Sequence, residues 1–131
     1  AYETAEIISG KIHKSIFLEK DLREFGWGIM EGKVKGARSY NNTPFEPEKW
    51  WKEDIVPAGA ETFSAFVSRT FKATNYHLSL YQNILFVAHG VIIMAILTAI
   101  GQPLRRVDNT ALFHFITPTL GQTYWEVNIL N

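Results

Sequence analysis

An apolar segment that runs directly into a histidine and a glycine limits the folds open to this chain more than any other feature. Residues 84–88 are all apolar, His89 and Gly90 follow, and residues 91–97 are apolar again. A short continuous apolar run is typical of a strand buried on both faces, whereas a longer run indicates a helix. His89 is therefore predicted to lie where a strand ends and a helix begins.

The corner between this strand and this helix is a candidate anion site. In open α/β sheets, ligands bind at the carboxyl ends of the strands, and the first turn of a helix presents free N–H groups and positive dipole. His89 and Gly90 occupy that corner, so the sequence predicts a phosphate site there. The alternative on local sequence alone is a histidine ring satisfied by a neighbouring backbone group.

Composition excludes several other kinds of site. The 131 residues suit one domain, residues 1–131, and 13 Lys and Arg balance 13 Asp and Glu, so no net charge favours nucleic acid or an anionic membrane. The absence of cysteine excludes disulfides, thiolate metal ligands and a cysteine nucleophile. The longest apolar stretch, residues 91–100, is too short to span a bilayer. We expect a soluble, cytoplasmic protein that binds neither nucleic acid nor membrane.

Hydrophobic periodicity predicts the remaining elements. Apolar residues at helical spacing, or a local helix-forming pattern, predict helices over residues 1–9, 48–53 and 60–75. Short apolar or alternating runs predict strands over residues 16–18, 84–88, 111–117 and 122–129, the last two forming a β-hairpin.

The polar stretch between residues 33 and 58 is predicted to cross the surface, because it is interrupted by three prolines, Pro44, Pro47 and Pro57. Trp50 and Trp51 are expected to be solvated there, and the alternative is that they line the mouth of a substrate site.

Four groups of residues recur in the order and spacing of a known family. In chain order they are Leu22-x-Glu24 with Trp27-Gly28 and Glu31-Gly32; Pro57-x-Gly59-x-Glu61-Thr62 with Arg69; residues 84–90; and residues 109–113 with 125–130. Over nearly its whole length the chain thus resembles the histidine phosphatase superfamily, in the branch of phosphoglycerate mutase-like phosphatases. The resemblance implies an α/β, three-layer fold with a mostly parallel sheet flanked by helices.

The resemblance also implies a phosphomonoester hydrolase that works through a phosphohistidine, without metal or cofactor, on a small phosphorylated substrate. It gives His89 a catalytic and substrate-binding role and Gly90 a substrate-binding role, since a protonated imidazole donates to phosphate oxygens and glycine admits close backbone approach. Glu24 matches the acid/base that protonates the leaving alkoxide. The alternative for Glu24 is an exposed ion pair with Arg23. Glu61 is interpreted as a helix dipole or capping group.

Two departures from the family pattern refine this interpretation. The family's Arg-His-Gly triplet, which supplies the nucleophilic histidine, does not occur in the sequence, and residues 1–5 are similar to the helix that follows it in the family. We therefore expect the N-terminal strands to be missing and the chain alone to be inactive, either folding poorly or forming a homo-oligomer through the exposed strands. Val91 and Met94 stand where mutases carry asparagine and arginine, which favours a phosphatase.

Two other classes of function are weighed against the phosphatase. A non-catalytic member of the family would keep the His89 corner and bind a phosphorylated ligand or partner. An α/β-hydrolase fragment would need a Gly-x-Ser-x-Gly elbow, and no serine in the chain is flanked in that way.

Overall fold

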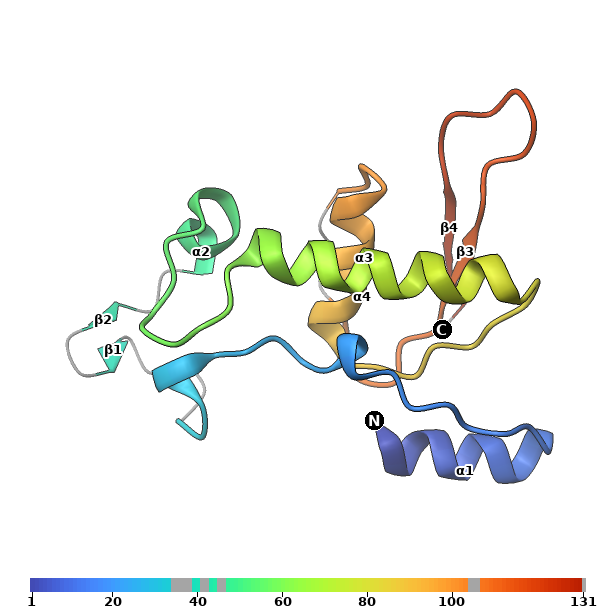
Figure 1. Cartoon of the computed structure of the whole chain (residues 1–131), viewed down its shortest axis with the longest axis horizontal. Coiled ribbons are helices and arrows are strands. Elements are labelled where there is room, and N and C mark those ends of the chain that lie inside the picture. The colour runs from blue at the N-terminus through green and yellow to red at the C-terminus, as the bar shows by residue number, and fades with distance from the viewer. Residues whose placement is uncertain (34–38, 41–42, 45–46, 104–106, 131) are drawn as a thin grey trace.

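The computed structural model describes residues 1–33, 39–40, 43–44, 47–103 and 107–130, and the structural statements below concern those residues. The four helices described are α1 (Tyr2–Ile12), α2 (Pro47–Glu53), α3 (Phe63–Leu80) and α4 (Gly90–Ala99) (Figure 1). The strands are β1 (Ser39–Tyr40), β2 (Thr43–Pro44), β3 (Phe113–Ile116) and β4 (Glu126–Ile129). Two short 3₁₀ helices, η1 (Lys20–Leu22) and η2 (Gly28–Met30), lie before β1.

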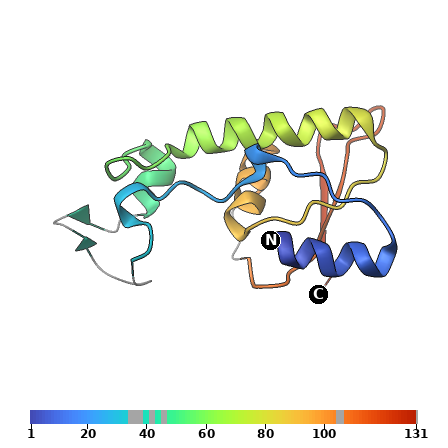
Figure 2. The ribbon, with the colours of Figure 1, turned by 60° about the horizontal axis from the view of Figure 1, so that its bottom comes forward.

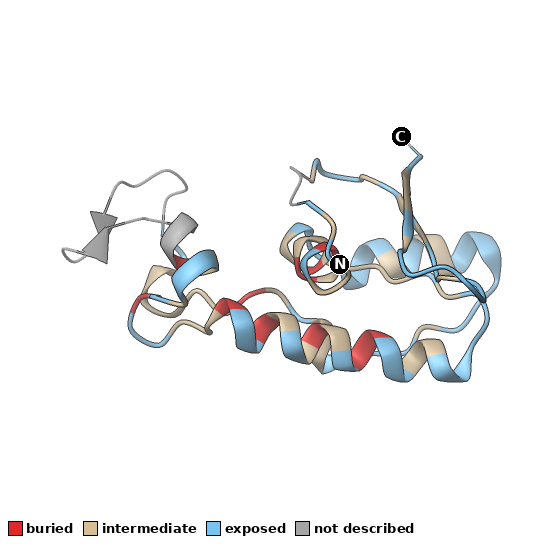
Figure 3. Ribbon diagram, turned by 90° about the horizontal axis from the view of Figure 1, so that it is seen from above, coloured by how far each residue is buried: buried red, intermediate tan, exposed pale blue. Residues whose placement is uncertain are grey.

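The long helix α3 organises the core. Its buried positions lie along one face (Figure 3), as the helical spacing of its apolar residues predicts. Thr62 caps the helix, since its hydroxyl accepts a hydrogen bond from the N–H of Ala65 at 3.3 Å. Phe66 is fully buried and packs with Ile92 and Ala95 of α4. Each such buried side chain contributes roughly 1.5–3 kcal/mol of hydrophobic stabilisation.

The helix predicted after His89 is confirmed as α4. His89 is the N-cap, with extended backbone, and the helix ends at Ala99, just before the turn at Gly101. Two predicted helices run further than expected: α1 continues through Gly10, and α3 continues to Leu80. Gly10 lies inside α1, because an isolated glycine is tolerated within a helix.

Trp50 contradicts the prediction of a solvated pair. It is only 3% exposed and its ring lies 6.0 Å from that of Trp27, while Trp51 is half-buried against Phe63 at 6.0 Å. The polar composition around these residues suggested solvent, but α2 places Trp50 against Trp27 and Trp51 against Phe63 of α3, where apolar area is removed from water.

The mostly parallel sheet expected from the sequence is not observed in the part of the chain described here. The hairpin is confirmed, with β3 and β4 antiparallel from Phe113 opposite Ile129 to Ile116 opposite Glu126, and β1 and β2 form a second antiparallel pair. Residues 16–18 and 84–88 have no strand assignment and make no backbone hydrogen bonds. An apolar run becomes a strand only beside another strand that accepts its hydrogen bonds.

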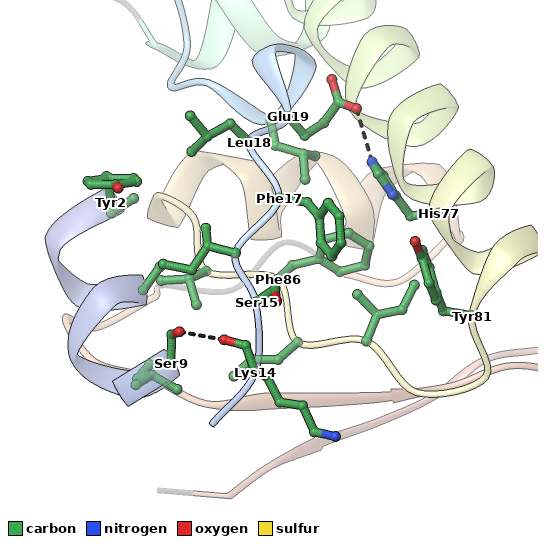
Figure 4. A pocket seen from close by; sticks show the side chains of 18 of the residues that line it. Tyr2, Ser9, Lys14, Ser15, Phe17, Leu18, Glu19, His77, Tyr81 and Phe86 are labelled. Carbon is green, nitrogen blue, oxygen red and sulfur yellow. Dashed lines mark hydrogen bonds and ion pairs between the residues drawn. The ribbon is translucent and has the colours of Figure 1, made fainter. Parts of the chain in front are cut away.

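These two segments instead border a cavity of about 900 Å³. They run between α1 and α3, as both Figure 1 and Figure 2 show. Phe17 and Phe86 line the cavity, together with His77 from α3, whose Nε2 lies 3.0 Å from Oε2 of Glu19 (Figure 4). The backbone groups along both segments are therefore open to pairing with a further strand.

The loops around residues 26–28 and 58–61 are hydrogen-bonded to each other beside the core. Trp27 and Ala60 form an isolated antiparallel bridge, and the N–H of Glu61 donates to the carbonyl of Gly26 at 2.9 Å. Gly28 has φ +56°, and a Cβ built there would lie 2.2 Å from the backbone nitrogen of Ala60. Only glycine fits this crossing, which fixes the segment following Glu24 against the start of α3.

We predict that Gly28→Ala destabilises the protein far more than Gly32→Ala. Gly32 also has positive φ, +69°, but no atom lies within 4 Å of the position that a Cβ would take there, so its substitution isolates the backbone strain of about 1–2 kcal/mol. The clash at Gly28 adds roughly 1–3 kcal/mol. Urea unfolding of the two variants measures the difference, and equal losses of stability would contradict the close loop crossing.

Candidate functional site

The structure brings together the two side chains to which the sequence assigned chemistry. Nδ1 of His89 lies 3.6 Å from Oε2 of Glu24. Both are partly open to solvent, with side chains 43% and 36% exposed. Both groups are therefore accessible from solution.

His89 lies at the start of α4, as predicted. Its carbonyl accepts the first hydrogen bond of the helix, from Ile92 N–H at 3.1 Å, and no side chain caps the helix. The N–H groups of Gly90 and Val91 precede this bond and have no acceptor within the helix. Gly90 is exposed, so an anion beside the His89 ring also meets free N–H donors and the positive end of the helix dipole.

Glu24 does not form the ion pair proposed as its alternative. The guanidinium of Arg23 lies 3.6 Å from Asp21 and 3.7 Å from Glu61 instead. Oε1 of Glu24 accepts a hydrogen bond from the N–H of Phe25 at 2.8 Å. One carboxylate oxygen is thus held by the backbone while the other faces His89.

The capping role considered for Glu61 is wrong, because Thr62 is the cap of α3 and Glu61 binds Arg69. The two carboxylate oxygens accept from Nε and Nη2 of Arg69 at 2.6 and 2.8 Å. Burial raises the pKa of Glu61, but the hydrogen bonds and charge of Arg69 outweigh it and hold the pKa below the ordinary value. The sequence included Arg69 in a motif without indicating this partner.

A second polar pair was missed altogether. His77 and Glu19 lie 58 positions apart and meet at the cavity wall, and no local pattern around either residue signals the other. The N–H of Asp21 and the ring of His77 lower the pKa of Glu19. His13 and His114 are exposed.

No group of three or more His, Cys, Asp or Glu side chains able to hold a metal ion occurs among the described residues. Within the same residues, no helix is long and apolar enough to cross a membrane. The His89 corner presents an imidazole, a carboxyl group and backbone N–H donors.

The lowered pKa of Glu61 predicts a specific acid sensitivity. Since folding favours the charged carboxylate, its stabilisation is complete above the ordinary pKa of 4.5 and is lost as pH falls through the lower folded value. We expect Glu61→Gln to lower the free energy of unfolding by on the order of 1–3 kcal/mol at neutral pH. The variant should also lose less stability than the native chain as the solution is acidified. Unfolding measured from pH 7 to 3 tests this. Glu3→Gln, on exposed α1, is the control, and an identical pH profile in both variants would be contrary to our account.

Comparison with known proteins agrees with the motif pattern. The family model of the histidine phosphatase superfamily (branch 1) matches residues 1–120. Neither the curated proteins nor the solved structures gave a match. The superfamily has an α/β fold and comprises phosphatases and mutases. Because the match covers most of the sequence, this chain belongs to the histidine phosphatase superfamily, branch 1.

Proposed function

We propose that this chain carries the phosphate-binding and acid/base part of a phosphomonoester hydrolase that works through a phosphohistidine. The observation that carries the proposal is the 3.6 Å approach of Glu24 to His89 at the uncapped start of α4. A carboxyl group and an imidazole beside free helix N–H groups supply the acid/base and the phosphate-binding donors of a metal-free phosphomonoesterase, whose nucleophile must come from another residue.

His89 binds the phosphoryl group. In its protonated form the ring donates to a non-bridging phosphate oxygen, and the N–H groups of Gly90 and Val91 are placed to donate to another. The charge that the phosphoryl group carries during transfer is spread over these oxygens, so donors fixed before the reaction lower its barrier.

Glu24 acts on the leaving group. When the bond between phosphorus and the ester oxygen breaks, the Glu24 carboxyl gives its proton to the departing alkoxide, and its carboxylate later takes a proton from the attacking water. In the family the phosphoryl group passes meanwhile to the histidine of the Arg-His-Gly triplet, which this sequence does not contain. The chain by itself would thus bind a phosphate ester without turning it over.

Two further residues favour a phosphatase over a mutase. Val91 and Met94 lie in the first two turns of α4, half-buried and apolar. They offer no polar group to orient a second phosphorylated molecule. The alternative is that the chain belongs to a non-catalytic member that binds a phosphorylated ligand or partner at the same corner.

We expect inorganic phosphate to bind this chain and p-nitrophenyl phosphate to remain unhydrolysed. Phosphate should shift the NMR signals of the His89 ring and the Gly90 amide, and His89→Ala should weaken binding by about tenfold or more, since a charge-assisted hydrogen bond contributes about 1.5–3 kcal/mol. His114→Ala, which removes an exposed histidine of β3, is the matched control.

Phosphate-induced shifts that leave His89 and Gly90 unchanged would overturn the binding site. Turnover of p-nitrophenyl phosphate by the purified chain, abolished by a chelator, would overturn the metal-free mechanism. Turnover that resists the chelator would show that the chain supplies its own nucleophile, which contradicts the role given to the missing triplet.

A further inference from the structure

One arginine side chain binds the backbone that carries Glu24. Arg69 lies in α3 and is 12% exposed. Its Nη1 donates to the carbonyl oxygens of Asp21, at 2.6 Å, and Arg23, at 3.1 Å, and its Nη2 donates to the carbonyl oxygen of Glu24 at 3.1 Å. The backbone partners of this one guanidinium thus all lie within four consecutive residues, 21–24.

Together with the two bonds to Glu61, these contacts use all five N–H donors of Arg69. A guanidinium is planar and its donors point in fixed directions, so five acceptors satisfied at once determine the position of the bound backbone. A lysine has three donors on one nitrogen and cannot satisfy acceptors spread around the edges of such a plane.

The guanidinium is itself held by the core. Its central carbon lies 4.7 Å from the ring centroid of Phe66, which is fully buried. The carboxylate of Glu61, 14% exposed, binds the edge of the guanidinium formed by Nε and Nη2. Phe66 and Arg69 both belong to α3, so the carbonyl acceptors on residues 21–24 are held in a fixed position relative to this helix.

Other contacts hold the two ends of this segment, since Asp21 N–H donates to Oε1 of Glu19, Leu22 packs against the core and Phe25 is buried. The 3₁₀ helix η1 ends at Leu22 and the backbone of Arg23 is extended. The nearest backbone bonds on either side are from Arg23 N–H to Lys20 and from Glu61 N–H to Gly26. The carbonyl oxygen of Glu24 accepts its hydrogen bond from Arg69, so Arg69 orients the peptide plane that follows Glu24. The orientation of this plane sets the direction of the Glu24 side chain.

We propose that Arg69 is the positioning residue of Glu24, setting its carboxylate beside His89 by fixing the peptide backbone of residues 21–24. The inference rests on the proposed function only for the meaning of that position, because the contact between Glu24 and His89 exists without a ligand. A purely structural arginine would stabilise the fold without controlling this contact.

The test reads the contact directly by NMR in the ligand-free chain. Glu24→Gln should shift the His89 ring signals, because it removes a negative charge 3.6 Å from Nδ1. The same substitution is then made in two backgrounds. In Arg69→Lys the shift should fall severalfold, because the charge is kept and the five-donor geometry is lost. In Arg23→Met, which removes a neighbouring exposed cation that donates to the carbonyl of Lys20, the shift should remain.

A full His89 shift in folded Arg69→Lys would overturn the proposal, even if that variant melts at a lower temperature. If Arg69→Lys does not fold, Glu61→Gln replaces it, with a reduced shift expected. Failure of both to fold would overturn the proposal as well, since the arginine would then maintain the fold itself. No His89 response to Glu24→Gln in the native background would remove the contact and the proposal with it.

A phosphate titration of the same samples separates this inference from the proposed function. Loss of the His89 shift in Arg69→Lys, without phosphate binding in any background, supports Arg69 as the positioning residue and overturns the phosphate site. Phosphate binding at His89 with an unchanged shift in Arg69→Lys supports the phosphate site and overturns the positioning role of Arg69.

Discussion

The ion pair between Arg69 and Glu61 connects the parts of this molecule on which the candidate site depends. The pair fixes the Arg69 guanidinium beside α3, where it also binds backbone carbonyls of residues 21–24, and both side chains are largely removed from solvent. A buried charge pair is tolerated only when its remaining donors and acceptors are satisfied, and here backbone carbonyls complete the set. Arg69 thus links the hydrophobic core to the backbone that carries Glu24.

The site consists of two halves held in different ways. His89 is placed by α4, whose buried residues pack against α3, so its position follows from hydrophobic packing. Glu24 lies on an irregular segment, and its position follows from hydrogen bonds to α3 and from the loop crossing at Gly28. Both His89 and Glu24 are therefore positioned by contacts with α3, which explains how residues far apart in sequence meet on an exposed surface.

Local signals predicted what local physics decides. The apolar run after His89 specified α4, and the alternation on both sides of a turn specified the hairpin of β3 and β4. The role of Glu24 was predicted from the family resemblance. Neither local patterns nor the resemblance predicted the backbone partners of Arg69, because a hydrogen bond across more than forty residues leaves no periodic signal in the sequence. The predicted strands 16–18 and 84–88 failed for the same reason: pairing depends on a neighbouring strand, not on the run itself.

The central claim is that His89, Gly90 and Glu24 form one phosphate-ester site. A crystal structure of the chain with tungstate, a tetrahedral anion that stands in for the phosphoryl group, tests it most directly. Our account predicts the anion within hydrogen-bond distance of the His89 ring and the Gly90 N–H, with the Glu24 carboxyl beside one of its oxygens. Tungstate bound elsewhere, or bound at Gly90 with Glu24 turned away from it, would contradict the account.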